Sequence, residues 1–560
     1  MNSIKENVHN FFKRNFFILL VFIFISMVTG VLFLHSKFVI GTTDLYFHWQ
    51  RILDLKSAIS HGDFYPSLAL DKINQTGSAV MSMYPKANLY PIVLLSYFFN
   101  DFTKLIPIIF VLRNLLSFLI SYYSCYSYNK NRKVSFLFSI SYTLTPLLLF
   151  YGVQGYDIGV SSSMIFMPLI LFGFLGLLKN NDWIELTIGM SCIILCHILN
   201  SVIIVCFLSV FMIFNVKKFM DKSKIKSLCK AVFNTVMITS VFFIPFLILN
   251  LNNKISLPEN TWLLNGTDVQ TLFFSSLNNI VSTASVSVTG VLGLVVSILL
   301  YKRLNLYSKQ LLLISIIFIL ICTNIFPWSI LEHTFIKDAL QFPTRLYVIP
   351  QLLLNLLFAE NIFKVFDKKV NSVIVLTVSI FIILLMHLGS QKQMINANRY
   401  NDPLNKPFWW HNNFVIKSNS DFYNLANSSA QIQDYYPRAT LNSSYVLNNH
   451  LATYDNNKKI SFVLKGNGKY NFKSNIHVKR LTIPFIYYNG MTYNVRLDGK
   501  SINYGHNNNS LMTIDNITSG NHVLIIIVKK TGLEIFSYFL FLIGILILIT
   551  GIFKKYFKTI

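Results

Sequence analysis

Long apolar stretches separated by short polar segments form the pattern of this chain over most of its length. A helix of about 20 mostly apolar residues crosses a hydrocarbon core of about 30 Å, and about twelve stretches approach or reach that length. They are 16–34, 104–127, 134–151, 158–178, 184–198, 201–215, 231–249, 286–301, 310–327, 345–363, 370–388 and 533–553. The pattern predicts a polytopic, all-α membrane body with about twelve transmembrane helices.

A first polar region, 35–103, follows the first span and contains one short apolar run, LYPIVLLSYFF at 89–99. That run is too short to cross a membrane. Counting it as a span would also move Arg132 and Lys133 away from the side that holds the other basic loops. We therefore predict an outer loop with a helix that lies along the membrane surface.

A second polar region, 389–532, is rich in Asn, Tyr, Ser and Gly and has little helical periodicity. In YNVRLDGKSINY, Asp498 and Gly499 stand between alternating runs, which is a hairpin signal. RLTIPFIYY and NHVLIIIVKK indicate further strands, and several short strands must stack or close to bury one face. We expect a transmembrane domain over 1–388, an extracytoplasmic β-sandwich-like domain over 389–532, and a final span with a basic tail over 533–560.

Composition agrees with this pattern, because 53% of the 560 residues are apolar and only 13% are charged. Such a chain is too apolar for a soluble multidomain protein. The formal net charge of +25 would suggest nucleic-acid binding in a soluble protein, but the basic residues recur at every second gap between spans. This positive-inside bias predicts a multi-pass protein of the cell membrane, with both termini cytoplasmic and no nucleic-acid partner. The basic segments are 5–14, 130–133, 179, 217–230, 302–309, 364–369 and 554–558.

The stretch GTTDLYFHWQRI, residues 41–52, follows the first span directly and contains three ionisable residues. On a helix capped by one of the two threonines, Asp44, His48 and Arg51 lie within about 60° of one another. They would form a polar ridge that faces a cavity, beside an apolar stripe that lies on the membrane. On position alone the alternative has equal weight: Asp44 stabilises the helix start, His48 fills space and Arg51 anchors to lipid headgroups.

Three further ionisable residues favour a functional site. Asp157 falls in the next outer loop, His197 at the outer turn between two half-length helices, and Arg345 at the outer start of a later span. Ionisable groups at membrane depth are costly and suggest a function by default. We therefore expect these residues to converge with Asp44 at the outer side of the membrane.

Several short motifs follow one another in a characteristic order. DLYFHWQRI and GDFYPS lie in the first outer loop, YP precedes the interfacial helix, and an acid stands in the second outer loop. DALQFPTRL, DYYPR and LTIPFIYYNGMTYNVRLDGK come later. This order resembles the GT-C superfamily of membrane glycosyltransferases. More narrowly, it is similar to the YfhO-like bacterial membrane proteins, including those labelled as related to 6-pyruvoyl-tetrahydropterin synthase.

The resemblance implies a GT-C-like fold and transfer of a monosaccharide from a polyprenyl-phosphate carrier to a cell-surface glycopolymer such as teichoic acid. Asp44 matches the first-loop aspartate that acts as general base on the acceptor hydroxyl, and Asp157 matches the second-loop acid. Arg345 matches the arginine of the QFPxR motif. Chemically, a carboxylate must take a proton from a weakly acidic hydroxyl while a cation holds the departing phosphate. One base and no covalent intermediate would invert the anomeric carbon.

The remaining candidate residues are assigned to substrate binding. His48 and His197 match recurrent histidines of the group, and Arg51 completes the polar ridge of the first outer loop. Arginine suits a phosphate because its planar fork bonds two oxygens. No DxD motif occurs in either outer loop, so we expect no cofactor and no obligatory metal, although the two candidate carboxylates could hold a divalent ion.

Two other functions fit the pattern of spans and polar residues. One is a transporter or flippase of a lipid-linked saccharide, against which stands the lack of a visible internal repeat. The other is a non-catalytic assembly protein whose outer domain binds glycan. In the transferase that the resemblance implies, the outer domain would grip the acceptor chain, because aromatic side chains suit sugar faces. The candidates are Trp409, Trp410, Tyr435, Tyr487 and Tyr488, although ordinary core and interface packing is favoured for each of them taken singly.

Overall fold

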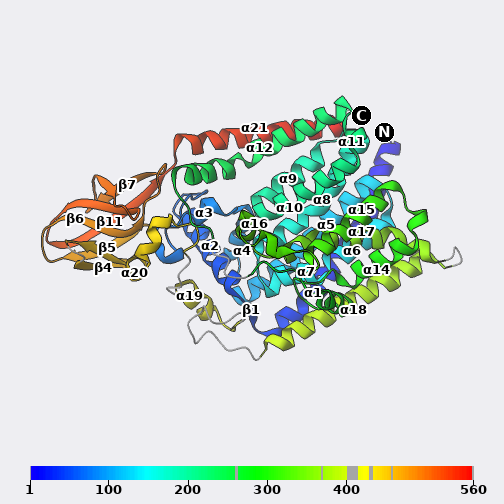
Figure 1. Cartoon of the computed structure of the whole chain (residues 1–560), viewed down its shortest axis with the longest axis horizontal. Helices are drawn as coiled ribbons and strands as arrows, with labels where there is room; N and C mark the ends of the chain where they lie inside the picture. Colours follow the sequence, from blue (N-terminus) through cyan, green and yellow to red (C-terminus); the bar gives the residue numbers. More distant parts are fainter. Residues whose placement is uncertain are drawn as a thin grey trace.

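The computed structural model describes residues 2–258, 263–366, 370–399, 414–427, 433–455 and 458–557. These residues form a mostly helical body with a β-sheet at one end (Figure 1). We call the end of the body beside this sheet the sheet end.

Within the described residues, seven helices are long and apolar enough to cross a membrane. They are α1 (Asn2–Ser36, apolar from Phe16), α5 (Phe102–Asn129), α8 (Ile158–Asn180), α12 (Lys222–Asn252), α17 (Val348–Val365) with the turn Pro343–Tyr347, α18 (Ser372–Asn398) and α21 (Gly532–Phe557). A bent pair makes an eighth candidate, with a 46° bend between α6 (Arg132–Thr143) and the segment Pro146–Gln154, which begins with α7 (Pro146–Leu149).

The predicted number of twelve spans is not confirmed. Four of the predicted spans are helices of only 13 or 17 residues. They are α9 (Ile184–Cys196), α10 (Ile198–Phe214), α14 (Ser287–Leu299) and α15 (Leu306–Cys322). At 1.5 Å per residue such helices are about 20 to 26 Å long, less than a hydrocarbon core of about 30 Å. An apolar run does not show where the backbone leaves the helix, as it does at His197 between α9 and α10.

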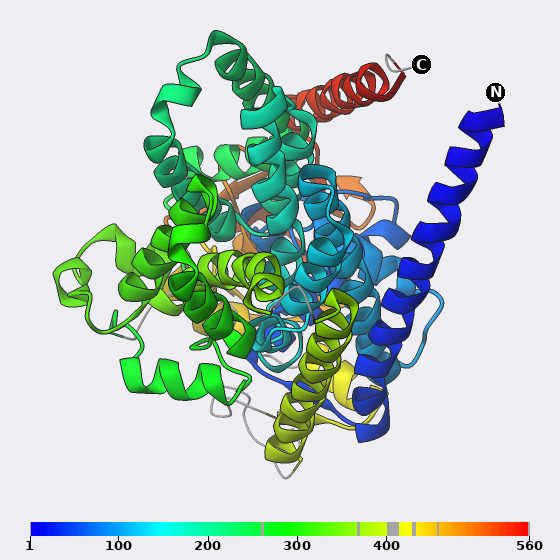
Figure 2. The ribbon, with the colours of Figure 1, turned by 90° about the vertical axis from the view of Figure 1, so that its right-hand side faces the viewer.

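The helices differ in how far they are buried. In their most apolar stretches, 83% of α8 and 78% of the span Pro343–Val365 is buried, against 33% of α1, 17% of α18 and 11% of α21. Figure 2 shows α1 and α21 apart from each other at the edges of the body. The exposed, apolar helices are therefore the ones with surface left for lipid.

Basic loops meet at the end of the body away from the sheet, which we call the basic end. Lys218 donates a hydrogen bond to the Tyr307 hydroxyl at 3.0 Å, and Lys555 forms an ion pair with Asp182. Both chain ends and α11 (Val216–Phe219) lie at this end in Figure 1. The basic loops that carry Lys218 and Lys555 thus lie on one side of the helical body.

The segment after α1 lies at the sheet end. Its strand β1 (Val39–Gly41) pairs in antiparallel fashion with β2 (Phe414–Ile416). Several helices of the described chain lie in the loops between the apolar helices. They are α2 (Thr43–Ser60), α3 (Val80–Met83), α4 (Tyr90–Ser96), α13 (Val269–Leu277), α16 (Phe335–Leu340), α19 (Asn419–Asn427) and α20 (Ser444–Asn448).

The apolar stripe of α2 packs inside the protein instead of lying on the membrane. Leu45, Trp49 and Ile52 are each 0% exposed. The Trp49 ring centroid lies 4.9 Å from that of Phe102 and 5.0 Å from that of Phe422, so α5 and α19 cover this face. Segments far along the chain supply these partners, which a local apolar pattern cannot reveal. The buried stripe fixes the rotation of α2 and hence the direction of its polar ridge.

Nine strands form one continuous sheet within the described residues, in the order β8-β7-β11-β5-β4-β3-β6-β10-β9. The strands are β3 (Leu451–Tyr454), β4 (Lys458–Leu464), β5 (Lys469–Ser474), β6 (Val478–Ile486), β7 (Thr492–Leu497), β8 (Lys500–Ser501), β9 (Tyr504–His506), β10 (Leu511–Ile517) and β11 (Gly520–Lys529). The Tyr493 and Tyr504 rings, from strands far apart in this order, lie 5.9 Å apart. The sheet therefore curls into a half-barrel around its own core. The hairpin predicted at Asp498 and Gly499 connects β7 to β8, and both residues have the positive φ that such a turn requires.

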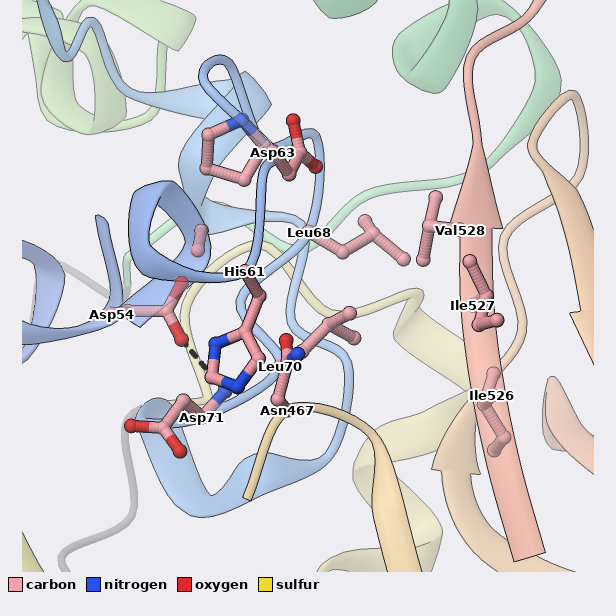
Figure 3. Close-up of a pocket in the computed structure, with 12 residues that line it drawn as sticks. Asp54, His61, Asp63, Leu68, Leu70, Asp71, Asn467, Ile526, Ile527 and Val528 are labelled. Carbon is pink, nitrogen blue, oxygen red and sulfur yellow. Dashed lines mark hydrogen bonds between the residues drawn. The ribbon is translucent and has the colours of Figure 1, made fainter. Parts of the chain in front are cut away.

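The sheet rests on the loop that follows α2. The Gly468 N–H donates to the Leu70 carbonyl at 3.2 Å, and Lys530 donates to the Tyr65 carbonyl at 2.6 Å. Figure 3 shows the small cavity at this junction, where the Leu68 side chain extends toward Val528 of β11 and the Asp71 carboxylate points away from that strand. These contacts couple the sheet to the helix that carries the first candidate residues.

Asp54 holds the same loop from the α2 side. Its carboxylate accepts hydrogen bonds from the Asp71 N–H at 2.8 Å, drawn in Figure 3, and from the Lys72 N–H at 2.9 Å. The second carboxylate oxygen is buried and has no hydrogen-bond partner among the described residues. Burial raises the pKa of Asp54 to about 7, although the backbone N–H groups favour the charged form.

Candidate functional site

A cavity of about 930 Å³ lies at the sheet end, and five of the six candidate residues line it. They are Asp44, His48, Asp157, His197 and Arg345. The helix α2, the start of α8, the junction of α9 and α10, and the turn before α17 each contribute to the wall. Residues from four separate parts of the chain therefore share one space.

Asp44 stands in the first turn of α2, with its side chain exposed to this space. The Thr42 hydroxyl does not cap α2 and instead donates to the Gly155 carbonyl at 2.7 Å, which ties the start of α2 to the loop before α8. Protein surrounds the cavity, and this burial raises the pKa of Asp44 to about 7. The negative charge of Asp157 adds to the rise, while the Arg345 guanidinium opposes it.

Asp157 is the N-cap residue of α8, and its carboxylate accepts a hydrogen bond from the Val160 N–H at 3.0 Å. The same oxygen lies 3.6 Å from His48 Nε2. Burial alone would raise the pKa of Asp157, but contact with His48 and the Val160 N–H outweigh it and lower the pKa. The cavity thus contains two carboxyl groups whose pKa values move in opposite directions, which separates a group able to take a proton from one that stays ionised.

The contacts of His48 define its tautomer. Its Nδ1 lies 3.3 Å from Nη1 of Arg51, and a guanidinium can only donate. Nδ1 is therefore the acceptor, and the imidazole proton is on Nε2, which faces Asp157. Burial lowers the pKa of His48, so the neutral ring donates toward the Asp157 carboxylate.

Arg51 is not among the residues that line the cavity, and its role in substrate binding stays a prediction. Its side chain is 0% exposed and donates through Nη2 to the carbonyls of Tyr84 and Pro85, at 3.1 and 2.7 Å. The guanidinium also lies 4.4 Å from the centroid of the Tyr84 ring. A helical-wheel angle placed Arg51 near Asp44, but the loop 84–85 closes over it. We assign it a positioning role, in which it fixes the orientation of His48 and Tyr84.

His197 separates α9 from α10 with an extended backbone, at φ −159° and ψ 116°. Its Nδ1 accepts a hydrogen bond from the Asn200 N–H at 3.1 Å, so the side chain caps α10. This bond leaves Nε2 as the protonated nitrogen. The ring lies 5.9 Å from that of Tyr84, and a Cβ atom at Gly159 would come within 2.9 Å of the imidazole. Gly159 thus leaves the space that Tyr84 and His197 occupy.

Arg345 is half-buried in the turn before α17. Among the described residues no hydrogen bond or ion pair engages its guanidinium, which lies 5.7 Å from the centroid of the Phe342 ring. An uncommitted arginine on a cavity wall can accept an anion without breaking an existing ion pair.

Several other residues of this cavity are not among the predicted catalytic or substrate-binding residues, although Tyr435 is one of the aromatic candidates of the outer domain. The segment Asp434–Arg438, the DYYPR motif, supplies Asp434 and Tyr435 to the wall. It is held by the bond from the Tyr435 N–H to the Ser256 carbonyl at 2.9 Å. Burial raises the pKa of Asp434 to about 6. The motif itself was visible in the sequence, but nothing local indicated that it faces Asp44. Tyr84, Asp338 and Gln341 also line the cavity and were not selected.

The aromatic residues expected to grip a glycan have different surroundings. Tyr488 is 0% exposed, and its hydroxyl donates to the Tyr435 carbonyl at 3.1 Å. Tyr487 stacks on His506 at 4.5 Å, away from the cavity wall, and only Tyr435 lines it. Trp409 and Trp410 lie outside the described residues.

Part of the cavity lining is apolar. The apolar residues that line the cavity include Val202 of α10, which is 52% exposed, and Phe335 of α16, which is 81% exposed. Leu257, in the segment after α12, also lines it and is 51% exposed. These exposed apolar side chains give the cavity an apolar part in addition to its ionisable residues. The arrangement can thus present an apolar chain on one side and its polar head to two carboxyl groups and an arginine on the other.

No group of three or more His, Cys, Asp and Glu side chains in the described part of the chain is arranged to hold a metal ion. Comparison with known proteins found no match for this chain among family models, curated proteins or solved structures. The geometry of the cavity is therefore the basis for any functional proposal.

Proposed function

We propose that this chain is a GT-C-type glycosyltransferase that moves a monosaccharide from a polyprenyl phosphate to a hydroxyl of a cell-surface glycopolymer. One observation carries the proposal. Asp44 and Asp157, with pKa values that move in opposite directions, line one cavity with the uncommitted Arg345 and an apolar wall. An acceptor hydroxyl, a phosphate and a lipid chain need these three features together.

In the proposed reaction, Asp44 takes the proton of the acceptor hydroxyl as its oxygen attacks the anomeric carbon. The bond between that carbon and the phosphate oxygen breaks, and the polyprenyl phosphate leaves with the electron pair. Arg345 holds this phosphate, where charge develops in the transition state. A single displacement with one base inverts the anomeric configuration.

Asp157 acts beside this base as a fixed negative charge. Its bond from the Val160 N–H and its contact with His48 hold the carboxylate in place. The charge raises the pKa of Asp44 and so makes it a stronger base. It would also stabilise positive charge that develops on the sugar ring. His197, with Nε2 protonated, is placed to donate to a sugar or phosphate oxygen, whereas the Nε2 proton of His48 is directed at the Asp157 carboxylate.

The proposed orientation puts the cavity and the sheet outside the cell. Its support is the set of basic loops at the opposite end of the helical body, because Lys and Arg are enriched in cytoplasmic loops. Both termini would then be cytoplasmic in a multi-pass protein of the cell membrane. The sheet, which curls into a sandwich-like half-barrel beside the cavity, would approach the polymer. A teichoic acid as the polymer follows from the sequence resemblance only.

The test uses the purified full chain in nanodiscs, a panel of radiolabelled polyprenyl-phosphate sugars, and cell-wall polymer as acceptor. The proposal predicts label in the polymer from one donor, an equal rate in the presence of EDTA, and no label with an Asp44→Asn, Arg345→Gln double variant. Asp515→Asn is the matched control, because it removes a 50% exposed carboxylate from the sheet. Failure of every donor in wild type would contradict the proposal, and donor movement across liposomes would then indicate a flippase.

A further inference from the structure

A second cavity, distinct from the functional one, forms an apolar groove of about 360 Å³ along α5. Its apolar lining comes from α4, α5, α8 and α9, with Ile92, Ile109, Leu112, Leu116, Ile165 and Leu195. Leu112 and Leu116 are each 43% exposed, so the groove opens at the surface of a helix that is apolar enough to span a membrane. Lipid chains therefore have direct access to it.

Arg113 lies in this groove with a guanidinium that the protein leaves unsatisfied. Its Nε and Nη2 atoms are buried and have no hydrogen-bond partner among the described residues. A Cβ atom at Gly152 would come within 1.5 Å of Nη1, so the guanidinium lies directly on the Gly152 backbone. A buried cation without a partner is costly, and in a membrane span the cost is greater. An anion from outside the chain would neutralise the Arg113 guanidinium.

The position of Arg113 suits a lipid headgroup. Gly152 stands three residues before Gly155, whose carbonyl accepts the Thr42 hydroxyl at the start of α2. The guanidinium thus lies beside the segment that leads into α8. From there the groove follows α5 to Leu116 and α8 to Phe166, which gives an apolar chain room to extend away from the headgroup.

A wall separates this groove from the functional cavity. Tyr156 and Ile158 line the groove, while Asp157, which stands between them in the sequence, lines the cavity. In the same way, Cys196 lines the groove and His197 lines the cavity. A donor lipid whose phosphate reaches Arg345 occupies the cavity side of this wall. The groove is therefore a second site and does not depend on the proposed transfer reaction.

We propose that the groove binds one chain of a membrane phospholipid, with its anionic headgroup phosphate on Arg113. A guanidinium fork can bond two phosphate oxygens, and among the described residues the Nε and Nη2 atoms of Arg113 have no hydrogen bond that would have to break first. The lipid fills the groove between α4, α5 and α8 and fixes the loop 152–158 from behind.

The test is native mass spectrometry of the delipidated full chain, titrated with phosphatidylglycerol, phosphatidylethanolamine or undecaprenyl phosphate. Phosphatidylglycerol should bind at one tight site, and Arg113→Gln should weaken this binding about tenfold or more, as for the loss of a charge-assisted phosphate contact. Lys104→Gln is the matched control, because it removes a 71% exposed cation from the same helix and should leave binding unchanged.

A second variant guards against misfolding of the first. Ser162→Phe keeps the guanidinium and fills the groove, so it should lower phosphatidylglycerol binding by a similar factor while Arg113→Lys retains part of it. Equal binding by wild type, Arg113→Gln and Ser162→Phe would overturn the proposal. Preference of the Arg113-dependent site for undecaprenyl phosphate over phosphatidylglycerol would overturn it as well, because the occupant would then be the polyprenyl lipid.

Discussion

His48 Nε2 lies 3.6 Å from the Asp157 carboxylate, and this contact joins α2 to the N-cap of α8. Arg51 fixes the other ring nitrogen of His48, while the Val160 N–H fixes Asp157 from the opposite side. The chain of contacts holds a permanent negative charge beside Asp44 without pairing that residue directly. Asp44 is left exposed to the cavity and with a raised pKa, as a base needs to be.

The pH dependence of transfer should report Asp44. Its carboxyl group must be ionised to take a proton, and its pKa is raised to about 7. We expect log kcat/KM to rise with pH up to about 7 and then to level. Initial rates between pH 5 and 9 measure this. A profile that is already flat from pH 5 would contradict the assignment of Asp44.

Asp157→Asn should shift that profile to lower pH. The Asp157 charge contributes to the high pKa of Asp44, so its removal lowers the pKa and allows ionisation at lower pH. The Asn side-chain oxygen still accepts the Val160 N–H, which preserves the cap. A fall in rate without any movement of the midpoint would show that Asp157 does not act on Asp44 through its charge.

Arg345→Gln should lower kcat/KM by roughly 10²–10³-fold, because the departing phosphate loses its cation. Arg345→Lys should restore only part of the loss, since an ammonium lacks the planar fork of the guanidinium. Steady-state kinetics with the labelled donor measure both variants. Equal rates for wild type and Arg345→Gln would remove the arginine from the proposed site.

Asp54 should make stability depend on pH. Its pKa is raised from 3.8 to about 7 in the folded chain, so the folded state holds the proton more tightly than the unfolded state. The protonated form therefore stabilises the fold fully below about pH 4, and this contribution is lost as pH rises through 7. Between pH 5 and 8 the Tm of wild type should fall more than that of Asp54→Asn. Parallel Tm curves would contradict this.

Much of the helical body could be predicted from the sequence, because apolar length is a local property. The number of spans could not be predicted, since α9 ends and α10 begins where the backbone leaves the helix at His197, a change that hydropathy does not record. The curled sheet was predicted only as a sandwich-like domain. Its strand order brings β3 beside both β4 and β6, and such long-range pairing has no signature in a single strand.

For the candidate site, ionisable residues at the predicted ends of spans pointed to one shared location, and five of six line one cavity. Arg51 is the one that does not line the cavity, because the loop 84–85 covers it and helical spacing carries no information on that loop. Asp434 is not among the predicted residues, and Tyr435 is predicted only as an aromatic residue of the outer domain. The DYYPR segment reaches the cavity through its backbone bonds to Ser256, which no local pattern reveals. Contacts between distant segments decide which polar residues face a common space.

The proposed function depends above all on Asp44 as the base that activates the acceptor. The most direct test is the rate of sugar transfer by Asp44→Asn in nanodiscs, with Asp515→Asn as control and Tm as a check of folding. We predict a loss of ~10²–10⁴-fold in kcat for Asp44→Asn at an unchanged Tm, and a wild-type rate for the control. Transfer by folded Asp44→Asn at the wild-type rate would contradict the account.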